Sequence, residues 1–229
     1  MRKLAFAMAS YGMLQVLGRA SGSTAAERRR RLPGDELVAD PVVVTNHALT
    51  IDAPADAVWP WLVQMGWRRG GWYTPRWVDQ MFFPANRPST DRILPEFQHL
   101  DVGDSVPDGP PEAGCGFLVE DLRPGEYLVL HSRSHLPQRL MEQGAWIDWT
   151  WVFALEDVGE GRSRVLIRSR VNLSPRWVAL AYTLGLVPAD FVMARQMLRG
   201  IARRAVRRHV MLAGGPRVPK RHRIVARAS

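Results

Sequence analysis

The sequence predicts an α+β fold in which a run of antiparallel strands lies between helices. Between residues 116 and 173, short segments alternate apolar and polar residues, and turns containing glycine separate most of them. This alternation is typical of antiparallel strands that bury one face and expose the other to water. The flanking segments instead carry apolar residues at helical spacing. Strands that follow one another between helices favour a single sheet with its helices on one face.

The first strand is expected over residues 42–51, and two short helices should follow it. Pro54 suits the first turn of a helix, and apolar residues then recur at helical spacing over 58–65. Pro60 lies inside this helix, where it removes a backbone hydrogen bond and predicts a bend. The second helix is predicted over residues 72–83.

Four further strands and two C-terminal helices complete the prediction. Residues 84–104 are expected to form an ordered loop, and a polar loop should cover residues 133–143. Pro175 and Pro188 each suit the start of a helix, so the pattern predicts two helices near the C-terminus, over 175–186 and 188–210. The four strands are predicted over residues 116–122, 127–132, 146–155 and 164–173.

Charge is distributed unevenly along the 229 residues. Residues 1–31 hold 7 basic and 1 acidic residue, and residues 195–229 hold 11 basic and none acidic. The central part is therefore acidic, which argues against a nucleic-acid domain with a basic face. The two basic ends indicate either binding to an anionic surface or a contribution to the solubility of the protein. The single cysteine, Cys115, excludes an intramolecular disulfide and fits a cytoplasmic protein with possible membrane association.

The chain is expected to divide into three parts. Residues 1–39 form an apolar and basic segment, and its uncharged run over 4–17 is shorter than the roughly 20 residues that a membrane span needs. A cleaved signal peptide and a peripheral or packed helix are the two alternatives for this run. Residues 40–211 should form the globular domain. Residues 212–229 are basic and lack periodicity, which predicts a disordered tail.

Several separated motifs resemble the polyketide cyclase and START-like superfamily (SRPBCC), and more narrowly an actinobacterial branch of it. They are LTIDAP and VWPWLVQMG within residues 49–66, DRILPE at 91–96, LRPGEYLVL at 122–130 and MLRGI at 197–201. The resemblance spans about residues 32–208. It implies a helix-grip fold, a curved antiparallel sheet around a long C-terminal helix with an apolar cavity between them. Members bind lipids, sterols, hormones or polyketides, and some cyclise or dehydrate them, without shared catalytic residues.

Aromatic residues on one face of the strand at 146–155 should line this cavity, although at least one of them is expected to pack in the core. Gln64 could face the cavity or cap a helix end. His47 and His131 could together supply acid–base chemistry, although an inward histidine is more often simply hydrogen-bonded. The residues predicted to bind a ligand are Trp61, Gln64, Met65, Trp72, Tyr73, His131, Trp149, Trp151, Phe153, Phe191 and Met197.

No motif assigns a catalytic residue, a metal site or a cofactor. His131 and His135 are four residues apart but lie in strand and loop, and no HExxH or phosphate-binding loop occurs. Three functions remain open. The first is binding of an apolar or aromatic small molecule or lipid in the cavity. The second is a cyclase or dehydratase acting on a polyketide-like substrate. The third is a peripheral lipid-binding protein on an anionic membrane, with no nucleic acid expected as a partner.

Overall fold

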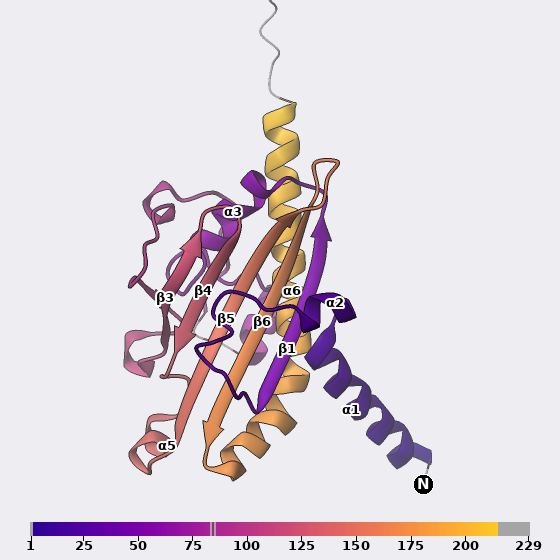
Figure 1. Ribbon diagram of the computed structural model, residues 1–229, viewed down its shortest axis with the longest axis vertical. Coiled ribbons are helices and arrows are strands. Elements are labelled where there is room, and N and C mark those ends of the chain that lie inside the picture. Colours follow the sequence, from indigo (N-terminus) through magenta and orange to yellow (C-terminus); the bar gives the residue numbers. More distant parts are fainter. Residues whose placement is uncertain (1, 83, 85, 215–229) are drawn as a thin grey trace, which may run out of the picture.

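Six antiparallel strands form one sheet, in the order β1–β6–β5–β4–β3–β2. The computed structural model describes residues 2–82, 84 and 86–214. The helix α6 (Arg176–Ala213) lies along one face of the sheet (Figure 1). This is the helix-grip arrangement. The strands are β1 (Val43–Ile51), β2 (Ser105–Pro107), β3 (Gly116–Arg123), β4 (Tyr127–Ser132), β5 (Trp146–Asp157) and β6 (Ser163–Ser174).

Short helices connect these strands, and they agree with most of the sequence prediction. α3 (Ala55–Val63) contains Pro60, and α4 (Arg76–Phe82) lies within the predicted second helix. The short α5 (Gln138–Glu142) lies in the predicted polar loop, and β2 is a strand that the pattern did not predict. The remaining elements are α1 (Arg2–Ala20), α2 (Ala25–Arg29) and two 3-10 turns, η1 (Pro95–Phe97) and η2 (Pro111–Ala113). The predicted tail from residue 215 onward lies outside the described residues.

Strand alternation decides which side chains face α6. On β5, Trp151, Phe153 and Leu155 belong to the core cluster beneath α6 and α3, whereas Val152 and Ala154 pack on the opposite face. The register carries this division across the sheet, since Phe153 pairs with Ile167 of β6, which pairs with His47 of β1. The face toward α6 is called the inner face below.

Residues 21–39, which the sequence analysis placed before the domain, pack on the outer face of the sheet. Leu32 is buried there against Val129, Val152 and other apolar residues of the sheet. In Figure 1 this dark violet segment crosses in front of β5 and β6. Only a few widely spaced apolar residues of the segment make these contacts, and such a pattern has no period that the sequence could reveal.

Charged side chains fasten the same segment to the sheet. Thr24 caps α2, and its hydroxyl accepts a hydrogen bond from the backbone N–H of Glu27, while Glu27 accepts one from the backbone of Thr24. The Glu27 carboxylate also receives two hydrogen bonds from Arg164 of β6, at 2.7 and 3.0 Å. These bonds favour the ionised form and lower the pKa of Glu27 to about 2.

α6 is one continuous helix, whereas the sequence analysis predicted a break before Pro188. Proline lacks an N–H, so the carbonyl of Leu184 cannot receive its usual bond within the helix. The hydroxyl of Tyr11 on α1 donates to this carbonyl at 2.6 Å. Gln15 donates to the neighbouring carbonyl of Thr183 at 2.9 Å. The proline removes one donor, and Tyr11 of α1 supplies a replacement for it at the carbonyl of Leu184.

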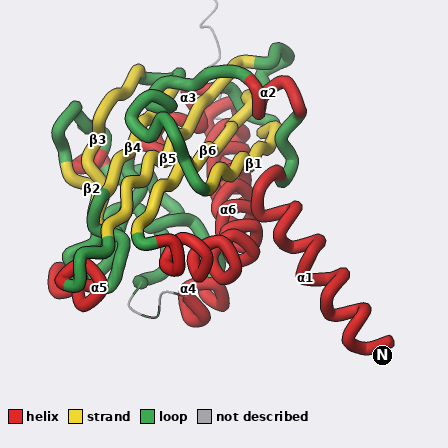
Figure 2. The backbone as a smooth tube through the Cα atoms, turned by 60° about the horizontal axis from the view of Figure 1, so that its bottom comes forward, coloured by secondary structure: helices red, strands yellow, loops and turns green. Residues whose placement is uncertain are grey.

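α1 packs on the body through its C-terminal part only. A Cβ at Gly18 would lie 2.1 Å from the carbonyl oxygen of Val187, so the absence of a side chain lets α1 and α6 approach closely. Residues 2–13 are exposed, and Figures 1 and 2 show this end of α1 projecting from the body. The exposed apolar residues surround the helix rather than forming the one-sided stripe of an amphipathic helix.

Candidate functional site

A cavity of about 270 Å³ lies between the inner face of the sheet and α6. Side chains from β1, β5 and β6 form its floor, and the middle of α6 covers it. Two loop segments, around residues 72–74 and around residue 108, close one side together with His135. Leu186 on α6 is half exposed and lies at the rim. The lining residues are Val43, Thr45, Trp72, Thr74, Asp108, His135, Trp149, Trp151, Ser169, Val171, Tyr182, Leu186, Val187, Asp190, Met193 and Met197.

Three tryptophans form an aromatic wall of the cavity. Trp149 and Trp151 lie two residues apart on β5, so both point to the inner face, with ring centroids 5.6 Å apart. Trp72 comes from the loop after α3 and lies 5.3 Å from the ring of Trp151. Phe117 of β3 packs behind them, 4.9 Å from Trp149. Such a wall favours flat, apolar ligands.

A buried histidine–aspartate pair lies on the α6 side of the cavity. His47 points to the inner face of β1 and is almost completely buried. Its Nε2 lies 2.9 Å from Oδ2 of Asp190, which lines the cavity from α6. The Nδ1 atom of His47 is buried without a partner among the described residues. Because His47 contacts only Oδ2 of Asp190, the second carboxylate oxygen can accept a hydrogen bond from a ligand in the cavity.

A second pair lies on the loop side. Nδ1 of His135 lies 2.6 Å from the hydroxyl of Ser132, and its Nε2 lies 3.2 Å from Oδ2 of Asp108. The imidazole packs 4.5 Å from Phe117 and 4.8 Å from Trp149, which fixes its orientation. Asp108 and His135 both line the cavity. Each of the two carboxylate–imidazole pairs therefore contributes to the lining, and the two pairs come from different elements.

A phenol and two hydroxyls add hydrogen-bonding groups. Thr45 and Ser169 face each other across β1 and β6 and interrupt the apolar inner face. Tyr182 lines the cavity from α6, and burial together with the charge of Asp190 raises the pKa of its hydroxyl. Tyr182 therefore stays protonated and can donate a hydrogen bond. The cavity combines an apolar wall with groups that can bind or transfer a proton.

Four of the predicted site residues line this cavity: Trp72, Trp149, Trp151 and Met197. Phe153 lies on the same face but packs completely in the core, as expected for at least one of the aromatic residues. Phe191 is partly buried on α6, and it is not among the lining residues.

Trp61, Gln64, Met65 and Tyr73 form a buried cluster away from the cavity. Gln64 donates to the carbonyl of Arg92 at 3.1 Å and accepts from the N–H of Leu94 at 2.9 Å, so it holds a loop in place. This agrees with the backbone-capping alternative for Gln64. The hydroxyl of Tyr73 donates to the carbonyl of Trp61 at 2.8 Å, and burial raises its pKa.

His131 lies on the outer face, so the expectation that it shares a site with His47 is wrong. Its neighbour Leu130 belongs to the inner core, and successive residues of a strand point to opposite faces. Its ring nitrogens contact Glu120 at 2.9 Å and Asp148 at 2.6 Å. His47 does point inward with Leu49 and Ile51, as the strand pattern predicted.

The sequence analysis missed most of the polar groups of the cavity. Asp108 and His135 lie in loops, where no periodicity predicts direction. Two signals were present, however. Asp190 is the only acidic residue of the 38 in α6, and Thr45 and Ser169 occupy positions where the strand alternation calls for apolar residues. A single acidic residue on a helix that packs on the sheet, together with polar residues at strand positions that face this helix, could have indicated the site.

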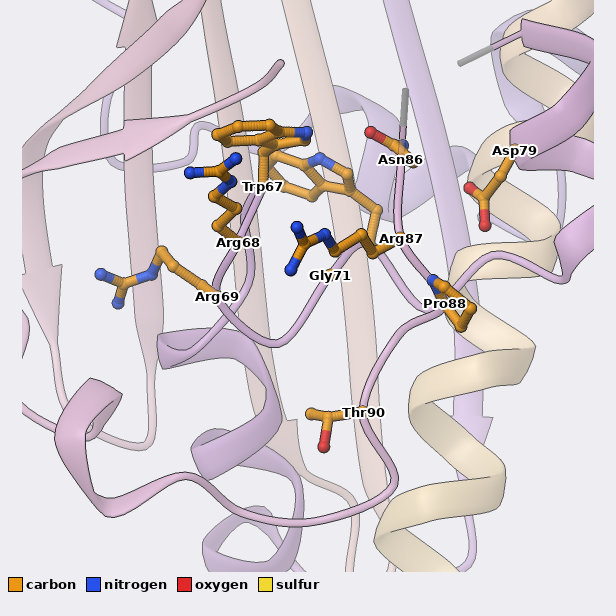
Figure 3. Close-up of a pocket in the computed structure, with 10 residues that line it drawn as sticks. Trp67, Arg68, Arg69, Gly71, Asp79, Asn86, Arg87, Pro88 and Thr90 are labelled. Atoms are coloured by element: carbon orange, nitrogen blue, oxygen red, sulfur yellow. The ribbon is translucent and has the colours of Figure 1, made fainter. Parts of the chain in front are cut away.

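A second hollow, of about 400 Å³, lies on the other side of Trp72. Figure 3 shows that its charged side chains do not converge: Arg69 extends away from Arg87, and Asp79 lies at the far side. Arg69 donates to the carbonyls of Met65 and Val63, and Asp79 accepts from Thr74. These groups serve the local structure, so the cavity beneath α6 is the better candidate site.

No family model and no curated protein match this sequence. Solved structures of similar arrangement do exist. The hypothetical protein jhp0584 from Helicobacter pylori is 11% identical with a TM-score of 0.47, covering 76% of this chain and 95% of that one. A norcoclaurine synthase from Thalictrum, in complex with a transition-state analogue, is 13% identical with a TM-score of 0.41, covering 72% and 94%. DynU16, from the dynemicin biosynthetic locus, is 15% identical with a TM-score of 0.34, covering 68% and 46%. At these identities the likeness concerns the fold alone.

Proposed function

We propose that this protein binds a small, largely aromatic molecule in the cavity between the sheet and α6. The observation that carries the proposal is the wall of Trp72, Trp149 and Trp151 beside a space of about 270 Å³. An apolar cavity of about 150 Å³ is enough to bind benzene. A two-ring aromatic molecule therefore matches the available volume, whereas a long lipid chain or a sterol exceeds it. Ligand sites of this kind combine an apolar lining with a few polar groups.

Filling the cavity should abolish this binding. Ser169 is small, faces the cavity and lies beside Trp151 in the register, so Ser169→Leu would place a branched side chain in the ligand's space. We expect naphthylmethanol to quench the tryptophan fluorescence of the natural protein saturably. The apparent affinity should fall about tenfold or more in Ser169→Leu, which corresponds to about 1.4 kcal/mol.

The matched control is Ser105→Leu, because Ser105 is exposed on the edge strand β2 and lies away from the cavity. It should bind like the natural protein. Absence of saturable quenching in the natural protein, or equal quenching in Ser169→Leu, contradicts the proposal. Native mass spectrometry of the purified protein separates a carrier from a cyclase or dehydratase. Recovery of one bound species supports a carrier, and recovery of two species that differ by one water supports dehydration by the carboxylate–imidazole pairs.

We also infer a second candidate function, contact with a lipid bilayer through α1 and the first half of α6. Four large apolar residues on the projecting end of α1 are exposed by 60% to 76%: Leu4, Phe6, Met8 and Met13. Trp177 and Leu180 of α6 are exposed by more than half. Exposed large apolar side chains gathered on two adjoining helices are typical of a surface that meets a membrane or another protein. By length and composition α6 could also span a membrane, but its second half packs in the core.

A bilayer fits this surface better than a protein partner does. The apolar side chains surround α1, and a lipid phase can contact a helix on all sides, whereas a packed partner needs one stripe. Arg2 and Lys3 precede the apolar run, and residues 2–20 of α1 include no acidic residue. Basic residues near a surface of anionic lipid each contribute about 1 kcal/mol of attraction.

Vesicle sedimentation tests this candidate. We expect the natural protein to sediment with vesicles that contain phosphatidylserine and to sediment less with neutral vesicles. The double variant Phe6→Asp, Met8→Asp should remain in solution. The control variant Val158→Asp removes an apolar side chain that is exposed in the turn between β5 and β6, and it should bind vesicles normally. Loss of a dimer, rather than of vesicle binding, in the double variant would show that a second copy of the chain covers this surface.

A further inference from the structure

The charged groups that line the cavity narrow the chemical class of its ligand. This inference rests on the proposed function, the binding of a small aromatic molecule. Two carboxylates, Asp108 and Asp190, line the space, while none of the 16 lining residues is lysine or arginine. Among the described residues, the ion-pair partners of both carboxylates are histidines. Elsewhere arginines pair with aspartates, as in Asp35–Arg168 and Asp91–Arg204, and Asp148 contacts Arg133 as well as His131.

His47 leaves the charge of Asp190 uncancelled. If the imidazole were protonated on both nitrogens, Nδ1 would carry an N–H that is buried without an acceptor. In the neutral form, Nε2–H donates to Asp190 and Nδ1 carries no N–H that would need an acceptor. The hydrogen bond orients the carboxylate, and its negative charge remains.

The hydrogen bonds around His135 lead to the same result for Asp108. The backbone N–H of Ser134 donates to the hydroxyl oxygen of Ser132 at 3.1 Å, so the hydroxyl proton is free to point to Nδ1 of His135 at 2.6 Å. Nε2–H then donates to Asp108. Each donor and acceptor in this series of hydrogen bonds has a partner when the imidazole of His135 is neutral. Asp108 therefore also keeps its negative charge.

The aromatic wall attracts the same kind of group. The face of an indole ring carries negative potential and binds ammonium groups, most strongly where water is excluded. Trp149 and Trp151 are tilted by 32° to each other, and Trp72 by 35° to Trp151, and all three rings line the same cavity as the two carboxylates. Carboxylates and indole faces repel an anion and leave a neutral ligand without a charged partner.

We propose that the ligand is a small aromatic amine, bound as its cation. Its ring lies on the tryptophan wall, and its ammonium group is attracted by the negative charges of Asp190 and Asp108, which line the cavity from two sides. The amine displaces no bond of His47 or His135, since each carboxylate bonds to its histidine through a single oxygen. The second oxygen of each remains available as an acceptor.

Three probes of one size separate this proposal from general apolar binding. Naphthylmethylamine, naphthylmethanol and naphthoate carry a positive, a neutral and a negative group on the same rings. By titration calorimetry with the full chain, we expect the amine to bind about tenfold or more tightly than the alcohol, and naphthoate to bind weakest. Asp190→Asn and Asp108→Asn should each lower the affinity for the amine by about tenfold and leave the alcohol nearly unchanged.

The matched control is Asp148→Asn, because Asp148 lies next to Trp149 on β5 but points to the outer face. It should leave the affinity for the amine unchanged. Melting curves confirm that each variant is folded, and the two cavity aspartates give independent tests. Equal affinities for amine and alcohol, or tightest binding of naphthoate, overturn the amine proposal and leave the cavity function intact. Failure of all three probes to bind overturns the cavity function itself and the amine proposal with it.

Discussion

Replacing Arg168 with leucine should lower the free energy of unfolding by about 3–5 kcal/mol, the loss expected when one partner of a buried ion pair is removed. Arg168 is almost fully buried on the outer face of β6. Its guanidinium donates to the carboxylate of Asp35 at 2.7 Å and to Asn46 at 2.8 Å. It also donates to the carbonyls of Arg30 and Glu27, at 2.9 and 2.8 Å. Urea denaturation of the variant measures the loss.

The size of this effect depends on the charge left behind. Without Arg168, the buried carboxylate of Asp35 keeps only the backbone N–H of Leu32 and the more distant guanidinium of Arg170, 3.9 Å away. The double variant Arg168→Leu, Asp35→Leu should therefore recover part of the lost stability, since it removes both charges. Arg123→Leu is the control, because Arg123 pairs with Glu126 on the surface, where an ion pair contributes little, so its loss of stability should be far smaller than that of Arg168→Leu.

Proteolysis gives a second measurement of the same contact. The guanidinium of Arg168 holds the carbonyls of residues 27–30 against the sheet, next to a run of arginines that trypsin recognises. Trypsin should cleave the Arg168→Leu variant at this run faster than the natural protein. A loss of stability below about 1 kcal/mol with unchanged cleavage would mean that residues 21–39 are held by apolar packing alone.

This segment also shows where prediction from the sequence ended. The strands were predictable because a period of two residues is local, and β4 was predicted with its observed bounds. Arg168 stands at a polar position of the alternating strand at 164–173, where alternation predicts exposure to water, and its burial depends on Asp35, which lies 133 residues earlier in the chain. No local pattern connects two such residues, so the outer-face layer could not be foreseen.

The candidate site likewise contains residues that the sequence predicted and residues that depend on distant or loop structure. Trp149 and Trp151 follow from strand alternation, whereas Met197 was expected from the resemblance to a helix-grip fold. Tyr73 was expected in the cavity as well, yet its backbone has a positive φ of 59°, which turns its side chain toward Trp61 and α6. A left-handed backbone at a residue with a large side chain is uncommon and cannot be read from its type. Asp108 and His135 depend on loop conformation and were missed for a related reason.

Gly200 of α6 should tolerate no side chain, because the backbone of Tyr73 contacts it. A Cβ at Gly200 would lie 1.9 Å from the carbonyl oxygen of Tyr73 and 2.9 Å from its Cβ. In an exposed helix interior, glycine to alanine stabilises by about 1 kcal/mol. At Gly200 we expect the opposite sign, a loss of about 2–3 kcal/mol, since α6 and a rigid backbone must separate. Thermal and urea denaturation measure the change.

Gly185 provides the matched control on the same helix. Nothing lies within 4 Å of a Cβ built there, so Gly185→Ala should stabilise the protein by up to about 1 kcal/mol. The two substitutions are chemically identical and differ only in the contact with Tyr73. Because Trp72 and Met197 line the cavity on either side of this contact, Gly200→Ala should also weaken the binding of naphthylmethylamine, whereas Gly185→Ala should not. If Gly200→Ala stabilised the protein as Gly185→Ala does, α6 would not lie against Tyr73, and the position of Trp72 in the cavity wall would lose its support.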